Sequence, residues 1–508
     1  MTAQAGVTAQ ARPLVTDWSV GRALVAALPA VVIGTILLLR GLIDGPTLDG
    51  AVFAVIGDAV AHGAIPYRDA FDHKPPGVYI ANALAGIALP GAGPWFRAWL
   101  VSWISTAGAL VGLSILLTRS GRPWYGIAAA SLLTLPLFAA DHFVLGGGQT
   151  ESVGLLFSVA GLGLVASSRR LAWIAVGGAT LGAAVLISVQ FIPALLAGAV
   201  VAVTPREGRI KRLIAVGIGS AVIPLISVAW IGANGALPQM LEQVIAYNRA
   251  YLAENQQYRD KGLYWAAADT LWLLPAVIAA VARILSFRRR PLNGLEIGAT
   301  AWLVSGVVLL LAQGLIFDHY LTALAPPVVL LAAPALAAAL EGARRLNHPA
   351  LATSILLFAL AGPVIVGLAI TEASAPAAPP SPAVADRVKQ LTGADDPIFV
   401  WGNEASLYLD ADRPLASRFV YMFPLTAAGY TTPELVAGIV DAWDTRPPRV
   451  IVDATRNPGR VGGYPLEPST DASAPDAVLD PLRRWVLQHY QVVDTVDGWD
   501  LYEEKPNT

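Results

Sequence analysis

Ionisable side chains gather in one short stretch of an otherwise apolar chain, "AIPYRDAFDHKPPGVYI" at residues 64–80. Arg68, Asp72, His73 and Lys74 lie close together there, and the Pro-Pro-Gly that follows cannot continue a helix. We therefore expect these side chains to be held in a turn. Such groups can transfer protons and hold anions. They can equally be charges that face lipid headgroups and only anchor the loop.

Other unusual polar residues are spread along the chain. Asp49 follows the first apolar segment, where it could act as a base or simply cap a helix. A carboxylate at Glu151 could bind a substrate or only interact with a helix dipole. The further candidates for substrate contacts are Gln190, Tyr247, Arg259, His319 and Tyr320. Whether these residues form one site depends on the elements that carry them.

The composition restricts the class of protein. Of the 508 residues, 55% are hydrophobic and 14% are charged, whereas soluble domains carry about a quarter charged residues. This predicts a membrane protein. The net charge of −2 argues against nucleic-acid binding, which needs a basic surface. The absence of cysteine excludes disulfides and thiolate chemistry. The polar first twenty residues do not resemble a secretory signal, so the first apolar run is expected to be a retained span.

Apolar runs that cross about 30 Å of hydrocarbon need roughly 20 residues. The sequence predicts about eleven such runs, which must be helices because lipid-exposed backbone has to satisfy its own hydrogen bonds. They lie near residues 22–40, 95–118, 124–141, 150–168, 172–189, 190–204, 213–235, 263–286, 295–317, 320–341 and 351–371.

Arginine and lysine in alternate short loops set the predicted orientation. The positively charged loops lie at residues 119–122, 169–170, 206–212, 288–290 and 344–345. These loops and the amino terminus are predicted to be cytoplasmic, in a multi-pass protein of the plasma membrane. An odd number of spans then delivers the carboxyl-terminal segment to the extracytoplasmic side.

The first outer loop and the tail complete the predicted architecture. In the loop, "LDGAVFAVIGDAVAHG" and "GVYIANALAGIALPG" are too short to cross and are expected to be interfacial helices. We predict a transmembrane body over residues 1–372, a Pro- and Ala-rich linker over 373–384 and a small α/β domain over 385–508. Its expected strands are "DPIFVWG", "PRVIVDA", "YQVVDTV" and "WDLYEE", alternating with helices at 382–391, 433–445 and 476–488.

In this topology, all the unusual polar residues fall on the extracytoplasmic side. Chance would scatter them to both faces, whereas a site at the outer membrane boundary requires this clustering. The main alternative is a lipid or solute transporter or flippase. Transporters place polar groups near the bilayer midplane, but the predicted span interiors are nearly free of charge. A third alternative is a noncatalytic scaffold that presents the outer domain.

Four segments together resemble a known family: Asp49 at the exit of the first span, "IPYRDAFDHKPPGVYI", "GGGQTES" and "FDHYLTALAPP". Over residues 20–340 the chain resembles the bacterial branch of the GT-C glycosyltransferases. These multi-span enzymes are related to protein O-mannosyltransferases and to the lipid A aminoarabinose transferase. In the tail, "IFVWGNEASLYLDADRPLASRFVYMFPL" looks like the outer domain that some of these proteins carry.

The resemblance implies an enzyme that moves a hexosyl or pentosyl group from a polyprenyl phosphate to a glycan, lipid or protein acceptor on the outer face. The family is expected to use a single carboxylate in the first outer loop as general base, and Asp49 matches it by position. Direct displacement with one base would invert the anomeric centre. The chain departs from many relatives at Gly50, where they have Glu, and at Ser188, where a Lys often precedes the Gln.

The leaving phosphate in such a reaction needs fixed donors and positive charge. Those cations are expected among Arg68, His73, Lys74 and Arg259, with His319 and Tyr320 as hydrogen-bond donors. A covalent intermediate would need a second carboxylate, for which Asp72 and Glu151 are the less favoured candidates.

Other cofactors are not expected. The chain has no Walker loop, so a nucleotide sugar is not the expected donor. Asp141-His142 and Asp318-His319 offer oxygen and nitrogen ligands, but neither pair has a chelating helical spacing. A divalent metal therefore stays a minor alternative, and no required cofactor is predicted.

Overall fold

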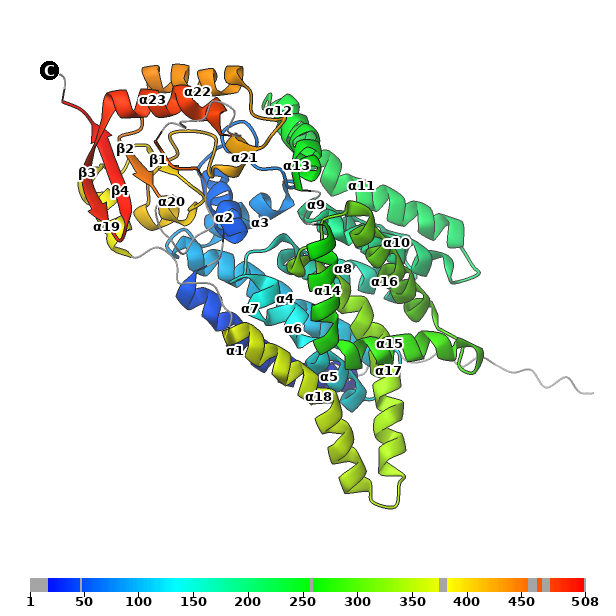
Figure 1. Cartoon of the computed structure of the whole chain (residues 1–508). Coiled ribbons are helices and arrows are strands. Elements are labelled where there is room, and N and C mark those ends of the chain that lie inside the picture. Colours follow the sequence, from blue (N-terminus) through cyan, green and yellow to red (C-terminus); the bar gives the residue numbers. More distant parts are fainter. Residues whose placement is uncertain are drawn as a thin grey trace, which may run out of the picture.

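Long apolar helices form the body of the computed structural model, which describes residues 17–45, 48–255, 259–373, 382–455, 464–467 and 476–506 (Figure 1). Within these residues, seven helices are long and apolar enough to cross a membrane. They are α1 (Asp17–Asp44), α4 (Pro94–Arg119), α8 (Thr150–Ser167), α11 (Arg209–Ala233), α16 (Gly294–Gln313), α17 (Ala325–Arg344) and α18 (Pro349–Ala373). The protein is therefore a multi-pass membrane protein.

The other predicted spans are helical but shorter or broken. They correspond to α5 (Trp124–Leu133), α6 (Leu135–Ala139), α9 (Leu171–Ile187), α10 (Ile192–Val203), α14 (Arg259–Trp272) and α15 (Leu274–Leu285). The last two meet at an angle of 85°, where a single span near residues 263–286 was predicted. Pro275 in the first turn of α15 lacks the N–H that would continue α14. The total of about eleven crossings stays a prediction.

The loop between α1 and α4 carries two of the expected helices. These are α2 (Leu48–Ala61) and α3 (Gly77–Ala88), which pack against each other. Phe53 of α2 and Tyr79 of α3 are both buried, with ring centroids 6.2 Å apart. Their apolar side chains share one core with the carboxyl-terminal domain. The two helices therefore pack against that domain. Their predicted place at the membrane interface stays a prediction.

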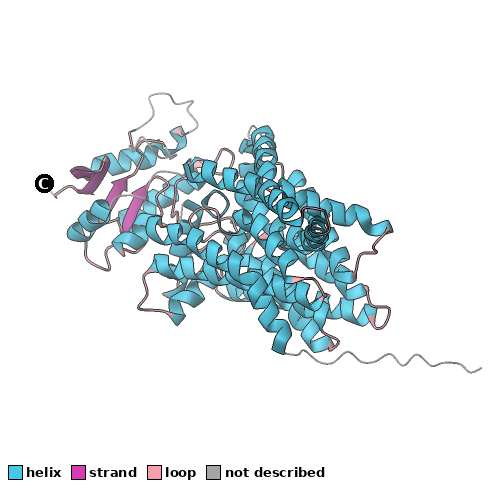
Figure 2. Ribbon diagram, turned by 90° about the horizontal axis from the view of Figure 1, so that it is seen from below, coloured by secondary structure: helices cyan, strands magenta, loops and turns pink. Residues whose placement is uncertain are grey.

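A four-stranded sheet forms the centre of the carboxyl-terminal domain, at the upper left of Figure 1 and the left of Figure 2. Its strands are β1 (Ile398–Trp401), β2 (Val450–Asp453), β3 (Tyr490–Val496) and β4 (Trp499–Glu504), in the order β1-β2-β4-β3. The β1–β2 pair is parallel and the other two pairs are antiparallel. All four strands lie where the sequence predicted them.

Helices surround this sheet: α19 (Pro382–Leu391), α20 (Ser406–Ala411), α21 (Phe423–Thr426), α22 (Pro433–Thr445) and α23 (Asp480–His489). The predicted fold class, a helical membrane body with a small α/β domain, is thus confirmed. Helix α18 ends at Ala373 and α19 begins at Pro382, and the rest of the predicted linker lies outside the described residues. The domain boundaries at 372 and 385 stay predictions.

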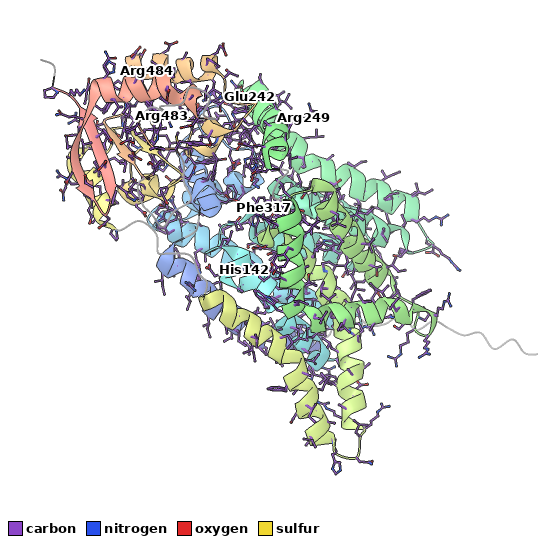
Figure 3. All side chains as sticks on the ribbon, viewed as in Figure 1. His142, Glu242, Arg249, Phe317, Arg483 and Arg484 are labelled. Carbon is purple, nitrogen blue, oxygen red and sulfur yellow. The ribbon has the colours of Figure 1, made fainter. Side chains whose placement is uncertain are left out.

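An outer arm after α11 connects the body with the domain. It consists of α12 (Leu237–Leu241), the π-helical turn η2 (Glu242–Tyr247) and α13 (Asn248–Glu254). Within the arm, Glu242 accepts a 2.5 Å hydrogen bond from the hydroxyl of Tyr430 in the carboxyl-terminal domain. Figure 3 labels Glu242 at the side of the arm that faces this domain. The arm and the domain therefore enclose the loop between α2 and α3.

Candidate active site

The charged turn after α2 is held by buried tyrosines. Tyr67 is fully buried and has φ 70°, a left-handed conformation that non-glycine residues rarely adopt. Its hydroxyl donates a 2.8 Å hydrogen bond to the carbonyl of Lys74. Its own carbonyl accepts a 2.7 Å hydrogen bond from Nε2 of Gln243 in the outer arm. The turn is therefore fixed at both ends, as the Pro-Pro-Gly predicted.

Asp72 is the structural centre of this turn. Its carboxylate is 2% exposed, and it accepts hydrogen bonds from the hydroxyls of Tyr79, at 2.6 Å, and Tyr421, at 3.1 Å. The backbone N–H of His73 donates to it at 2.7 Å. Burial raises the pKa of the Asp72 carboxyl, but His73, the Tyr79 hydroxyl and the charge of Lys74 together outweigh burial and bring the pKa below its ordinary value. With these lone pairs engaged, Asp72 is poorly placed to act as a nucleophile.

His73 lies between the turn and the outer arm. Its ring stacks on Tyr251 with centroids 5.7 Å apart and lies 5.2 Å from the ring of Tyr247. Its Nδ1 is 3.2 Å from Oδ1 of Asp72. The side-chain amide of Asn248 donates to its carbonyl at 3.1 Å. His73 and Tyr247 therefore pack the wall of the turn, and Tyr247 contributes through its ring.

Lys74 carries the positive charge of the site. Its ammonium lies 5.7 Å from the centroid of the Tyr320 ring, within reach of a cation–π interaction. Burial lowers the pKa of this ammonium, but the polar groups around it, Tyr320 and Asp49 foremost, more than offset burial and raise the pKa above its ordinary value. Among the described residues, no carboxylate oxygen lies within 4.0 Å of its nitrogen. Lys74 therefore stays positively charged, and its N–H groups are available to a ligand.

Asp49 stands in the first turn of α2 and faces this cation. It interacts electrostatically with Lys74 and with His319. In the described part of the chain, its half-buried carboxylate accepts no hydrogen bond and forms no ion pair. A carboxylate without such a partner, beside a half-buried cation, is suited to accept a proton from a substrate.

The "GGGQTES" segment positions α2 and α8. Leu145 and the three glycines after it all have positive φ, between 48° and 94°. The N–H of Gly146 donates to Asp141, and that of Gly148 to the hydroxyl of Ser102. These donors are already used within the protein, which agrees with the expectation that the segment is not a phosphate-binding loop.

Glu151 follows this segment in the first turn of α8. The carboxylate is 1% exposed, and its Oε1 accepts a 2.8 Å hydrogen bond from the hydroxyl of Ser188. Its Oε2 is buried and has no hydrogen-bond partner among the described residues. Glu151 also acts electrostatically on Lys74. It is thus the third carboxylate near Lys74, after Asp49 and Asp72.

His319 and Tyr320 belong to the 3-10 turn η5 (Asp318–Leu324), which leads into α17. The His319 ring is 7% exposed and stacks on Phe317 with centroids 5.7 Å apart and an interplanar angle of 9°. Its centroid lies 4.7 Å from that of Tyr320. The turn therefore brings two potential hydrogen-bond donors beside Lys74 and Asp49.

Two predicted site residues, Arg68 and Gln190, are not brought into this cluster. Arg68 points to the surface, where its guanidinium bonds Asp69 at 2.7 Å. Gln190 donates a 2.8 Å hydrogen bond to Gln313 and serves the packing of the bundle. Arg259 begins α14, but its side chain lies outside the described residues.

Three further residues support the turn and were not predicted from the sequence. Tyr79 lies in an apolar helix, Gln243 in the outer arm, and Tyr421 in the carboxyl-terminal domain. Nothing in the local pattern distinguishes them from packing residues. Only the fold brings them to Asp72.

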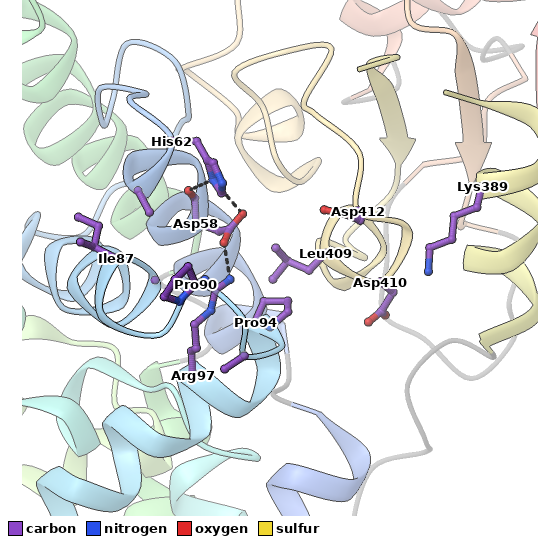
Figure 4. A pocket seen from close by; sticks show the side chains of 13 residues that line it. Asp58, His62, Ile87, Pro90, Pro94, Arg97, Lys389, Leu409, Asp410 and Asp412 are labelled. Atoms are coloured by element: carbon purple, nitrogen blue, oxygen red, sulfur yellow. Dashed lines mark hydrogen bonds and ion pairs between the residues drawn. The ribbon is translucent and has the colours of Figure 1, made fainter. Parts of the chain in front are cut away.

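A separate cavity of about 500 Å³ opens where α2, α3 and α4 meet α20 (Figure 4). Its lining includes the ion pair of Asp58 with Arg97, whose atoms are 2.5 Å apart, and the side chain of Asp410. None of the residues clustered around Lys74 lines it. The cavity is therefore distinct from the candidate active site.

Comparison with solved structures identifies the fold. The chain superposes on ArnT from Cupriavidus metallidurans bound to undecaprenyl phosphate with a TM-score of 0.60 and 14% identity, over 95% of this chain and 99% of that one. It also matches the apo oligosaccharyltransferase from Archaeoglobus fulgidus with a TM-score of 0.53 and 13% identity, over 86% and 69%. The same enzyme tethered to an acceptor peptide gives a TM-score of 0.50 and 13% identity, over 92% and 72%.

No protein-family model matches the sequence, and no curated protein matches it. At 13 to 14% identity the superpositions establish the fold and leave the activity to the residues of the site. The chain thus has the GT-C fold that it shares with ArnT, and the resemblance noted in its sequence is confirmed at that level.

Proposed function

We propose that this protein is a membrane glycosyltransferase that moves a sugar from a polyprenyl phosphate to an acceptor on the extracytoplasmic face. The observation that carries the proposal is that Asp49, whose carboxylate has no hydrogen bond or ion pair among the described residues, interacts electrostatically with the half-buried ammonium of Lys74. The fold supports it, because a neighbour with this fold was crystallised with undecaprenyl phosphate. The phosphate of a polyprenyl-linked donor fits a site whose cation, Lys74, forms no ion pair with a carboxylate of the described residues.

In the proposed reaction, Asp49 accepts the proton of an acceptor hydroxyl while that oxygen attacks the anomeric carbon. The bond between that carbon and the phosphate oxygen breaks, and the bonding pair leaves with the polyprenyl phosphate. A general base of this kind contributes about 10²- to 10⁴-fold to the rate. With one base and direct displacement, the anomeric configuration inverts.

Lys74 balances the charge that develops on the leaving phosphate. A fixed cation in a site of low dielectric is worth more than the same cation in water, and it needs no reorganisation during the reaction. His319 and Tyr320 border the same space and would donate hydrogen bonds to phosphate oxygens. Arg68 is turned to the surface and has no part in this scheme.

A covalent mechanism would need a nucleophilic carboxylate. The carboxylate of Asp72 accepts hydrogen bonds from Tyr79 and Tyr421, so Glu151 is the remaining candidate for the nucleophile. Retention of configuration together with a trapped ester on Glu151 would replace the single displacement proposed above. Inversion would assign Glu151 to balancing the charge of Lys74.

The central experiment uses purified full-length protein, membrane-extracted acceptors and a panel of synthetic polyprenyl-phosphate hexoses and pentoses. Transfer is measured as the release of free polyprenyl phosphate together with labelled product. Asp49→Asn should lose transfer by about 10²-fold or more while still binding the donor. Asp441→Asn, at an exposed position on α22, is the matched control. Mass spectrometry of envelope glycans and lipids in a deletion strain would identify the sugar and the acceptor.

An Asp49→Asn protein that still transferred sugar would refute the role of Asp49. Movement of the lipid across vesicles without cleavage of the sugar–phosphate bond, unchanged in Asp49→Asn, would instead support the transporter or flippase alternative.

A further inference from the structure

Three segments that are distant in sequence bring one histidine and two carboxylates together. His142 lies in the short helix α7 (Asp141–Val144), Asp269 in α14, and Asp318 at the start of η5. Nε2 of His142 is 3.0 Å from Oδ1 of Asp269 and 3.4 Å from Oδ2 of Asp318. Figure 3 labels His142 in the membrane body, near α14. One ligand atom from each of the three residues lies within 4.8 Å of the others.

The distances from Nε2 of His142 to the two carboxylate oxygens suit ligand atoms that bind one small metal ion. A tetrahedral ion with bonds of about 2.0–2.1 Å to nitrogen and oxygen holds its ligand atoms roughly 3.3 Å apart. The two distances from Nε2 fall around that value. An imidazole favours Zn²⁺ and other transition ions, while carboxylates are shared by Zn²⁺ and Mn²⁺.

A buried oxygen points to a missing partner in the same cluster. Asp269 is 3% exposed, and its Oδ2 has no hydrogen-bond partner in the part of the chain that the structure describes. A buried carboxylate oxygen without a donor is costly, and it is one of the features that a bound cation would satisfy. A second carboxylate, Asp318, lies beside it, so the cluster holds two acids and one imidazole.

The surroundings fix the imidazole and leave one side open. Phe143 meets the His142 ring edge to face with centroids 4.9 Å apart, and Trp272 lies 5.3 Å away. The side chains of His142 and Asp318 are 24% and 32% exposed, whereas that of Asp269 is 4% exposed. Water could therefore complete the coordination from the open side.

We propose that His142, Asp269 and Asp318 bind one divalent transition-metal ion, Zn²⁺ or Mn²⁺, at a structural site separate from Asp49 and Lys74. The ion ties α7, α14 and η5 together. His142 and Asp318 belong to the two Asp-His pairs that the sequence offered as possible ligands. Their grouping with Asp269 could not be predicted, because each ligand comes from a different segment. The proposal does not depend on the glycosyltransferase activity.

The test uses full-length protein without a histidine tag, stripped with EDTA, dialysed and then incubated with Zn²⁺ or Mn²⁺. Elemental mass spectrometry should find about one ion per chain, and the ion should raise the midpoint of thermal unfolding. His142→Ala and Asp318→Asn should each lower the affinity for the metal by about tenfold or more. Asp318 is partly exposed, so its variant is expected to fold even if changes at Asp269 do not.

His348→Ala is the matched control, because His348 is an exposed histidine outside the cluster. The control should bind the ion as the parent does. Absence of stoichiometric binding to the parent protein, or equal binding by His142→Ala, would overturn the proposal. If the parent protein bound no metal and metal-free His142→Ala were less stable to heat than the parent, a protonated imidazole alone would join the two carboxylates.

Discussion

The hydroxyl of Tyr421 donates a 3.1 Å hydrogen bond to Oδ1 of Asp72, although the two residues are 349 positions apart. This bond joins the carboxyl-terminal domain to the turn that carries Lys74. The contact is extended by the stacked rings of Phe71 and Phe419, 5.3 Å apart, and by the N–H of Phe71, which donates to the carbonyl of Arg418. The domain therefore forms part of the support of the candidate active site.

Replacing Tyr421 by Phe should loosen this support and leave the core packed. A hydrogen bond to a buried charged group contributes about 1.5–3 kcal/mol, and every 1.4 kcal/mol is about tenfold in affinity. If half of this free energy is lost from donor binding because Lys74 is held less firmly, the KM for the donor should rise about threefold to tenfold. Donor titrations of the purified variant measure this effect.

Tyr490→Phe provides the matched control. The hydroxyl of Tyr490 donates to the carbonyl of Pro448 within the same domain, and neither residue contacts the turn. This variant should lose thermal stability with an unchanged KM. A Tyr421→Phe protein that behaved in the same way would limit Tyr421 to a role in stability.

Removing the charge of Lys74 should weaken binding of the phosphate group. Loss of a charge-assisted contact of about 1.5–3 kcal/mol predicts a roughly tenfold to hundredfold weaker affinity of Lys74→Ala for undecaprenyl phosphate in detergent. Lys74→Arg should retain part of the affinity, since it keeps the charge but changes its shape. The pKa of Lys74 lies above its ordinary value, so binding should not decline below about pH 10 through this group.

Arg68→Ala is the comparison, because it removes a cation that bonds Asp69 at the surface. Its affinity should equal that of the parent protein. Equal affinities for Lys74→Ala and the parent at low salt would count against a phosphate contact by Lys74.

Asp72 should make stability depend on acid pH. Its pKa in the folded protein is below the ordinary value of about 3.9, so its charge stabilises the fold above that value and loses this effect as pH falls through the folded pKa. Asp72→Asn should therefore unfold at a lower temperature at pH 7. The difference from the parent should shrink as the pH falls below about 4. Thermal unfolding of both proteins in detergent across pH 3 to 7 measures this difference. A difference that stayed constant with pH would show that the charge of Asp72 does not stabilise the fold.

Local patterns in the sequence were enough to predict the long apolar helices, the four strands and the longer helices of the carboxyl-terminal domain. The apolar runs, the alternation of the strands and the Pro-rich stops each depend on neighbouring residues, so helices 382–391 and 433–445 coincide with α19 and α22. The bend before Pro275 was missed because the apolar run continues through it. An apolar run specifies burial in lipid, but it does not specify a straight helix.

The candidate site was less predictable, because its residues meet only in the folded chain. Asp49 and Lys74 could be proposed from their place in the outer loop, since both are unusual there. The sequence could not predict that Arg68 points to the surface while Lys74 points into the site. These directions depend on the ion pair of Arg68 with Asp69 and on the left-handed turn at Tyr67. Tyr421 and Asp269 offered no signal, since each gains its role from a partner on a different segment.

The close approach of two backbones at Gly148 gives a prediction for the position of Asp49. Gly148 has φ 81°, and a Cβ atom there would lie 3.2 Å from Cα of Gly50, the residue after Asp49. Gly148→Ala should therefore have two effects. The left-handed backbone disfavours alanine by about 1 kcal/mol, and the added methyl group should push the start of α2 away.

Gly121→Ala separates these two effects. Gly121 has φ 75° and no atom within 4 Å of an added Cβ, so its variant carries the backbone strain without the steric contact. Gly148→Ala should lose at least as much thermal stability as Gly121→Ala, and only Gly148→Ala should lower kcat, by about tenfold for a shift that costs 1.4 kcal/mol in the transition state. If both variants kept the parent kcat, the reaction would not depend on where the first turn of α2 holds Asp49, which would count against Asp49 as the general base.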